Sequence, residues 1–168
     1  MAETTNRSKA VAGSIVLAGA SLVAFITGWE GNEETTYLDM IGKPTVCAGI
    51  TDPDIAVIGK TYTEEQCREL NAQEIAEHGE RMASCVEVPL SQGEYDAYTS
   101  FAYNVGTNAF CGSTLVKKLN AGNRQGACDQ LLRWNQAGGR VVTGLDNRRK
   151  AEHRMCVKAI TTGPKAVT

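Results

Sequence analysis

The fold is decided by the stretch "WEGNEETTYLDMIGKPTVCAGIT", which runs from Trp29 to Thr51. Its middle alternates β-branched and aromatic residues around a turn signal, Gly42-Lys43-Pro44, and this pattern predicts a β-hairpin or a small sheet. An apolar run precedes the stretch, and its helical pattern ends near Glu30. The expected β element is therefore small and directly follows a helix.

Helical patterns follow this hairpin. Thr63 predicts the start of one helix, because Gln66 stands three residues later in a capping box. Ser91 and Glu94 repeat the same device in the next helical stretch, which ends at Asn104-Val105-Gly106. Two longer helices are therefore expected in the middle of the chain.

The last third of the chain also has a helical pattern. We expect shorter helices within residues 113–122 and 125–139, and a last helix that begins at Asp146. Apolar spacing indicates a core that includes Phe101, Tyr103, Leu131, Leu132 and Trp134. One small β element early in a mostly helical chain predicts an α+β fold, in which a small N-terminal hairpin lobe adjoins a larger helical lobe.

Length and composition indicate one globular domain with a core. The chain has 168 residues, of which 42% are hydrophobic and 21% charged, and this excludes a disordered chain. The net charge of −2 conceals a basic region between residues 133 and 158, which has only Asp146 and Glu152 as acids. The region suggests attraction to an anionic polymer or a phospholipid surface, and the alternative is a solvated basic helix face. Its basic residues are Arg133, Arg140, Arg148, Arg149, Lys150, Arg154 and Lys158.

Six cysteines are many for a chain of this size. None forms a Cys-x-x-Cys pair, and the two histidines, His78 and His153, lie in helical stretches, so we expect no metal site. An even number of widely spaced cysteines instead indicates disulfides formed in an oxidising compartment. Fifteen pairings are possible. The simplest is sequential, Cys47 with Cys67, Cys85 with Cys111, and Cys128 with Cys156.

The N-terminus offers a route out of the cytoplasm. Arg7 and Lys9 precede an uncharged run from Ala10 to Thr27, which is the layout of a secretory signal. Three interpretations are open: a signal peptide cleaved near Ala18-Gly19-Ala20, a permanent anchor, and a marginal membrane helix that leaves the bilayer. We prefer the third, because small and polar residues oppose the insertion of the apolar ones. The expected organisation is a weak transmembrane segment over residues 1–27 and a globular domain over residues 28–168.

Three residues of the opening stretch form a candidate catalytic group. Glycoside hydrolysis needs one carboxyl that holds a proton and one that stays ionised beside a water molecule or the developing cation. Glu30 follows an apolar helix and is the better candidate for the proton donor, whereas Asp39 lies among polar hairpin groups. Thr45 stands across the turn, where its hydroxyl is expected to bind the attacking water. Spacing alone does not separate this group from an exposed, unrelated pair of acids.

The order of the motifs supplies the context. "WEG", "YLD", "GKPT" and "AGIT" resemble the active-site signature of the phage-type lysozymes, the endolysin muramidases of glycoside hydrolase family 24. "SFAYNVGTNAFCGSTLVKKLNAGN" and "LLRWNQAGGRVVTGLDNRRKAE" look like that family's later motifs, so the resemblance spans residues 28–156. It implies a lysozyme-like fold with the active site in the cleft between the lobes.

The resemblance also implies roles for individual residues. Glu30 would be the acid, Asp39 the water-positioning carboxylate and Thr45 the helper hydroxyl. The saccharide would be bound by Tyr37, Gly49, Asn104, Gly106, Ser113 and Thr114. The chain departs from many relatives at Ile50, where an imidazole often helps to hold the lobes together, and we expect a disulfide at Cys47 to provide that support.

The N-terminus resembles one subgroup, the signal-arrest-release endolysins. The resemblance implies export to the host periplasm, tethering to the inner membrane through residues 10–27, and release as a soluble enzyme that cleaves the β-1,4 bond between N-acetylmuramic acid and N-acetylglucosamine. The segment contains no cysteine, so we expect control by topology alone. Peptidoglycan strands are the expected partner of a monomer that needs no cofactor and binds no nucleic acid. The alternatives are a lytic transglycosylase and an inactive wall-binding protein of the same fold.

Overall fold

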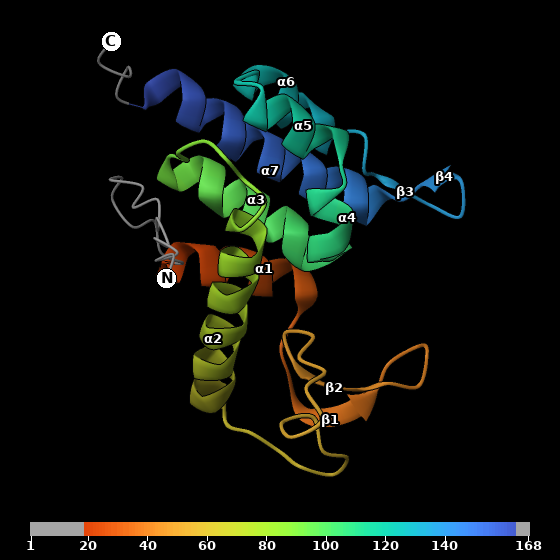
Figure 1. The fold of residues 1–168 in the computed structure, drawn as a ribbon. Helices are drawn as coiled ribbons and strands as arrows, with labels where there is room; N and C mark the ends of the chain where they lie inside the picture. The colour runs from red at the N-terminus through yellow and green to blue at the C-terminus, as the bar shows by residue number, and fades with distance from the viewer. Residues whose placement is uncertain (1–18, 164–168) are drawn as a thin grey trace, which may run out of the picture.

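The computed structural model describes residues 19–163, which form two lobes. Figure 1 shows a smaller lobe with the first hairpin below and a larger helical lobe above, with one long helix, α2 (Glu64–Ala83), running between them. This arrangement confirms the predicted α+β class, with a small hairpin lobe and a larger helical one.

The small lobe is built on strands β1 (Glu33–Leu38) and β2 (Pro44–Cys47), which pair antiparallel. The predicted turn joins them, with Gly42 at φ 78°, a conformation that glycine adopts without steric cost. Behind the hairpin lies a small apolar cluster, which consists of Val46, Cys47, Ile50, Ala56, Tyr62 and Cys67. The hairpin is thus held on its own small core.

Helix α2 begins in the small lobe and ends in the large one. Thr63 Oγ1 accepts from Gln66 N at 3.2 Å and Gln66 Oε1 accepts from Thr63 N at 2.9 Å, which is the predicted capping box. Cys67, near the start of α2, is bonded to Cys47 of β2. Ile75 and Met82, further along, are buried in the core of the helical lobe.

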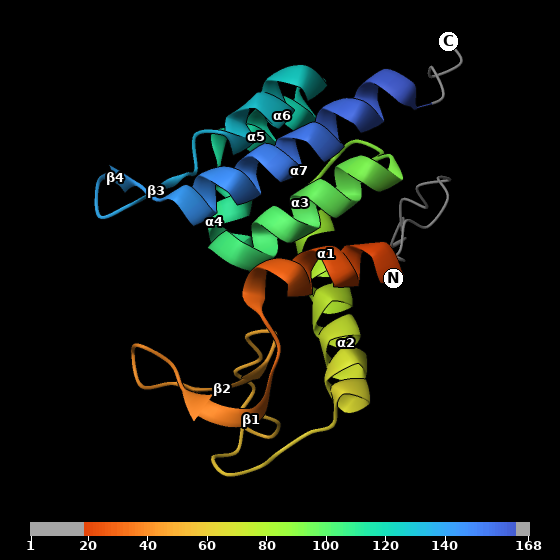
Figure 2. The ribbon, with the colours of Figure 1, turned by 180° about the vertical axis from the view of Figure 1, so that it is seen from behind.

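The helical lobe is centred on α3 (Gln92–Val105) and α7 (Thr143–Thr162), which lie side by side in both views (Figures 1 and 2). Around them lie α4 (Thr107–Cys111), α5 (Thr114–Asn120) and α6 (Arg124–Leu131). The core between these helices contains Tyr98, Phe101, Phe110, Leu115, Leu119 and Leu131.

Helix α1 (Ala20–Glu30) packs on this lobe, with Leu22 and Ile26 buried in the same core. It is continuous across the expected boundary between residues 27 and 28. Residues 10–18 of the expected membrane segment lie outside the described residues. Among residues 19–163, no helix has both the length and the apolar character that a membrane crossing requires.

One predicted helix boundary and one core residue are wrong, and a second hairpin was not predicted. The short helix expected within residues 125–139 ends at Leu131, and strands β3 (Gln136–Ala137) and β4 (Arg140–Val141) follow. Gly138 and Gly139 have φ of 58° and 75°, which is what a tight two-residue hairpin turn requires. The last helix starts at Thr143 rather than Asp146. Leu132, expected in the core, is 37% exposed because it follows the end of α6.

All three disulfides have the predicted sequential pairing, Cys47–Cys67, Cys85–Cys111 and Cys128–Cys156. The first ties the hairpin to α2, and the third ties α6 to α7. The second joins the segment after α2 to the end of α4. Each bond therefore fixes a different junction of the fold.

Candidate active site

Glu30 is presented by the apolar face of α1. Leu22, Ile26 and Glu30 are spaced by four residues, so they lie along one side of the helix. The first two are buried in the helical lobe, and the Glu30 side chain, 24% exposed, follows them at the helix end. Gly31, at φ 82°, then turns the chain toward β1. Packing of α1 thus sets the position of the carboxylate at the junction of the lobes.

Arg148 of α7 binds the Glu30 carboxylate. Its Nη1 donates to Glu30 Oε1 at 2.5 Å, although the two residues are 118 positions apart in the chain. The Arg148 side chain is only 4% exposed. A charge-assisted hydrogen bond from so buried a guanidinium is short and directional, and it orients the carboxylate of Glu30.

Arg148 also contacts the fully buried carboxylate of Glu152. Glu152 Oε1 accepts from Arg148 Nε at 3.2 Å and from Ser100 Oγ at 2.6 Å, and Glu152 Oε2 lies 3.0 Å from Arg149 Nε. Arg149 Nη2 donates to Asn104 Oδ1 at 3.0 Å. Desolvation by burial lowers the pKa of Arg149 to about 10, so it remains a cation at neutral pH.

Asp39 and Thr45 both form hydrogen bonds with the backbone of Lys43. Asp39 Oδ1 accepts from Lys43 N at 2.8 Å and from Ile41 N at 2.9 Å, which fixes the carboxylate on the turn. Thr45 Oγ1 donates to Lys43 O at 3.0 Å, and the same carbonyl accepts from Asp39 N at 3.0 Å. Thr45 is buried and Asp39 partly exposed. The hairpin therefore places a carboxylate and a hydroxyl at one end.

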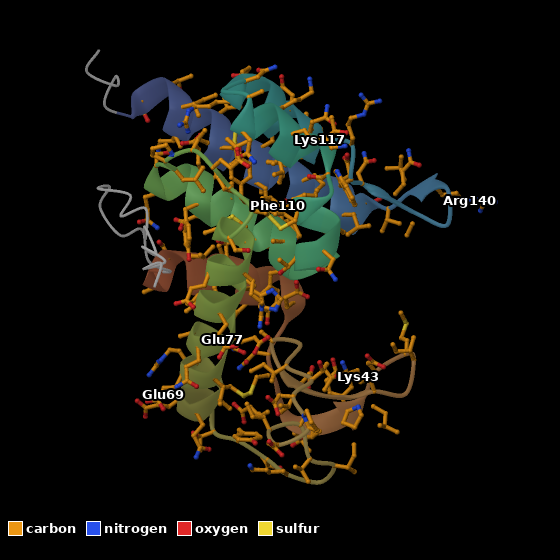
Figure 3. All side chains as sticks on the ribbon, in the orientation of Figure 1. Lys43, Glu69, Glu77, Phe110, Lys117 and Arg140 are labelled. Atoms are coloured by element: carbon orange, nitrogen blue, oxygen red, sulfur yellow. A yellow bond between two sulfur atoms is a disulfide. The ribbon has the colours of Figure 1, made fainter. Side chains whose placement is uncertain are left out.

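The two hairpins project from the same side of the molecule, one from each lobe, in both ribbon views (Figures 1 and 2). Figure 3 labels Lys43 on the β1–β2 hairpin and Arg140 at the tip of the β3–β4 hairpin. Asp39 and Thr45, bonded to Lys43, thus lie on this side.

The other predicted saccharide-binding residues occupy different settings. Tyr37 is 42% exposed on β1, opposite Thr45. Gly49 lies exposed in the turn after β2, at φ 88°. Asn104 is exposed near the end of α3, and Gly106 ends that helix at φ 89°.

Ser113 and Thr114, also predicted to bind the saccharide, differ in exposure. Ser113 is 6% exposed and caps α5, because its Oγ accepts from Val116 N at 3.3 Å. Thr114 is exposed at the first position of α5. A helix-cap role accounts for Ser113 without a bound sugar.

Sequence reasoning missed Arg148, Arg149 and Glu152 as site residues and described the two arginines only as part of a basic region. Both arginines are buried, so the solvated-face interpretation is wrong for them. Their spacing from Glu152, four and three residues on one helix, is the ion-pair spacing that would have indicated a network.

A cavity of about 650 Å³ lies elsewhere, between α1 and α2. Its lining includes Val23, Thr27 and Gly31 of the α1 side and Arg68 and Asn71 of α2, and it omits Glu30, Asp39 and Thr45.

In the part of the chain that the structure describes, no group of three or more His, Cys, Asp or Glu side chains is placed to hold a metal ion.

The sequence is similar to those of known proteins. The family described as phage lysozyme matches residues 27–152. The SAR-endolysin of Enterobacteria phage P21 is 36% identical over 151 residues, which cover 88% of this chain and 91% of the relative. The endolysin of Salmonella phage P22 is 37% identical over 124 residues, covering 72% of this chain and 85% of the relative.

Solved structures show the same fold. A variant of P22 lysozyme superposes with a TM-score of 0.76 at 33% identity, covering 84% of this chain and 98% of that one. The endolysin from Escherichia coli O157:H7 phage FAHEc1 also gives 0.76, at 30% identity and with coverage of 91% and 99%. With its sequence matched over residues 27–152 and its fold shared with these enzymes, the chain belongs to the phage lysozyme family.

Proposed function

We propose that this phage lysozyme, a glycoside hydrolase, is an endolysin that cleaves the β-1,4 bond between N-acetylmuramic acid and N-acetylglucosamine in host peptidoglycan. The observation that carries the proposal is the pairing of the Glu30 carboxylate with buried Arg148, at the junction of the two lobes. Peptidoglycan is the substrate that a lysozyme implies.

Glu30 is the proposed general acid. Arg148 binds Oε1, so the proton that Glu30 delivers is carried on Oε2 and passes to the glycosidic oxygen as the bond to the sugar breaks. The bond cleavage leaves positive charge on the sugar ring, which the carboxylates of the site stabilise.

Asp39 and Thr45 are proposed to hold the attacking water. Within residues 19–163, both hydrogen bonds to the Asp39 carboxylate reach Oδ1, which leaves Oδ2 to accept from a water molecule. Thr45 Oγ1 gives its own proton to Lys43 O and therefore acts toward water as an acceptor. These two acceptors orient the water's lone pair toward the sugar, and the proton that the water loses as it attacks passes to Asp39 Oδ2.

The proposed route to the wall uses the N-terminal segment. Residues 10–27 tether the newly exported chain to the inner membrane, and the chain becomes a soluble periplasmic enzyme on release. Two observations support this: several relatives at 36–41% identity carry the name SAR-endolysin, and the three disulfides suit an oxidising compartment.

The test is Glu30→Gln, with Glu33→Gln as the matched control, because Glu33 is exposed on β1 three residues away. We expect the first variant to lose essentially all clearing of purified walls and the second to keep it. Mass spectrometry of the wild-type products should show reducing sugar ends, whereas anhydro ends would indicate a transglycosylase. Activity of Glu30→Gln within a few-fold of wild type excludes the proposed acid.

A further inference from the structure

Glu152 is fully buried, and its carboxylate contacts two arginines that reach residues of the site. Its carboxylate contacts Ser100 Oγ, Arg148 and Arg149, at 2.6 to 3.2 Å. Removing a carboxylate from water is costly, and well-packed apolar residues often replace buried ion pairs without loss of stability. A role in stability alone therefore explains this carboxylate poorly.

The two arginines extend from Glu152 to two separate site residues. Arg148 donates to Glu30 on α1, and Arg149 donates to Asn104 at the end of α3. Arg149 also lies over the Phe101 ring, 4.8 Å from its centre, which fixes the direction of the guanidinium. One buried carboxylate thus holds both contacts.

The charges of the group balance. Two guanidiniums face two carboxylates, Glu30 and Glu152. Without Glu152, both cations would act on Glu30 alone and would favour its ionised form, which cannot donate a proton. Other titratable groups near Glu30 are Tyr103 on α3, whose pKa is raised by burial, and Glu74 and His78 of α2 beside it.

The Asn104 contact has a consequence for recognition. Because Oδ1 of Asn104 accepts from Arg149 Nη2, the amide nitrogen of Asn104 is the group that remains to act as a donor toward a ligand. Asn104 is exposed, so this donor is available to a sugar hydroxyl or acetamido oxygen.

We propose that Glu152 is a positioning residue for both Glu30 and Asn104, an inference that rests on the proposed function. Through Arg148 it offsets the positive charge that faces the Glu30 carboxylate. Through Arg149 it fixes the amide of Asn104 against the glycan.

The first test is Glu152→Gln, measured as wall clearing across pH and wall concentration. Loss of this negative charge should move the alkaline limb of the activity profile to lower pH by about one unit, the displacement that one nearby charge produces. The half-saturating wall concentration should rise several-fold as Asn104 loses its support. Glu69→Gln, the same change at an exposed position of α2, should leave both quantities unaltered.

The second test is the double variant Arg149→Gln/Glu152→Gln, which removes both members of an ion pair and therefore disturbs folding less than the single change. It restores the charge balance, so the alkaline limb should return to the wild-type position while the half-saturating concentration stays raised. Asn104→Ala should raise that concentration without moving the limb.

The outcomes separate the two proposals. If Glu30→Gln is active, the proposed function fails. If Glu30→Gln is inactive but Glu152→Gln keeps the wild-type alkaline limb of the pH profile and the wild-type half-saturating wall concentration, only the positioning role of Glu152 is overturned. If Glu152→Gln does not fold, the double variant decides. A wild-type half-saturating wall concentration in the double variant, or an alkaline limb displaced from the wild-type pH, also overturns the positioning role of Glu152.

Discussion

Tyr103 Oη donates to the main-chain carbonyl of Ala48 at 2.8 Å, and this bond joins α3 of the helical lobe to the loop after β2. The peptide N–H of Ala48 donates to Asn71 Oδ1 of α2 at 3.0 Å. Ala48 is therefore held from both sides. The disulfide at Cys47, expected to compensate for Ile50, is present, but it joins β2 to the start of α2 within the small lobe, whereas the Tyr103 bond joins the two lobes.

Tyr103→Phe should loosen this junction. Burial raises the pKa of Tyr103, so the phenol is a protonated donor at any working pH. Loss of its bond should lower the free energy of unfolding by about 1 kcal/mol, measured by denaturant titration. We also expect a several-fold loss of wall clearing, because the lobes carry different parts of the site.

The control is Tyr62→Phe, which removes the bond from Tyr62 Oη to Ile55 O at 2.7 Å inside the small lobe. It should cost similar stability and spare activity. Equal losses of activity in the two variants would show that the Tyr103 bond has no special link to the junction.

Asp39→Asn should lower the rate of wall hydrolysis by about 100-fold or more, the range of general acid–base contributions. The amide oxygen still accepts from Ile41 and Lys43, so the turn stays intact and the melting temperature changes little. Asp52→Asn is the matched control, because Asp52 accepts from Asp54 N at 2.8 Å in a similar turn. A rate near wild type for Asp39→Asn removes this carboxylate from the mechanism.

The disulfides should differ in their resistance to reductant. Cys128 and Cys156 are fully buried, as is Cys67, whereas Cys85 and Cys111 are partly exposed. Native protein in mild reductant should therefore open Cys85–Cys111 first, because attack by a thiolate requires access. Alkylation followed by peptide mass spectrometry identifies the first pair. Early labelling of Cys128 would contradict the burial argument.

His78 should make stability depend on pH. Burial, and then the charge of Arg81, lowers its pKa below the ordinary 6.5, against the opposing effect of Glu74. The unfolded chain therefore binds this proton first as pH falls, so stability decreases from about pH 6.5 toward the folded-state pKa.

The variant His78→Phe tests this, because it keeps a ring beside Tyr103, where the centroids lie 4.7 Å apart. Its melting temperature should fall less than that of wild type between pH 6.5 and 5. Parallel curves for the two proteins would exclude His78 as the source of the slope.

Local signals made much of this fold predictable. The capping box at Thr63, the turn at Gly42 and the disulfide pairing all depend on residues close in sequence or on simple loop order. The β3–β4 hairpin was missed because the helical spacing through Leu131 and Trp134 continues past the end of α6 and conceals the Gly138-Gly139 turn.

The site was harder to predict because its partners are distant. Glu30, Asp39 and Thr45 were singled out by a motif, but their catalytic roles remain a proposal. Arg148 is far from Glu30 in the chain, and the packing of α1 against α2 and α3 of the helical lobe brings Glu30 to it. The spacing of Arg148 and Arg149 from Glu152 indicates an ion-pair network, but burial of that network depends on tertiary packing, which the spacing does not show.

The last prediction concerns the two environments of α1. Leu22 and Ile26 are core residues here, whereas Gly19 and Ser21 are exposed, and a Cβ at Gly19 meets nothing closer than 3.8 Å. Leucine at both exposed positions should thus leave the packed enzyme intact while favouring the bilayer.

Gly19→Leu/Ser21→Leu should favour insertion by about 1 kcal/mol per substitution, or about 2 kcal/mol together. That shifts the tethered-to-soluble ratio about 30-fold toward the membrane, so lysis should be delayed. Fractionation of cells over time measures both. Ala83→Leu/Ala121→Leu adds leucine at exposed positions outside the segment and should lyse on schedule. If the Gly19/Ser21 variant enters the soluble periplasm as fast as wild type, residues 10–27 do not control release, and a cleaved signal becomes the better account.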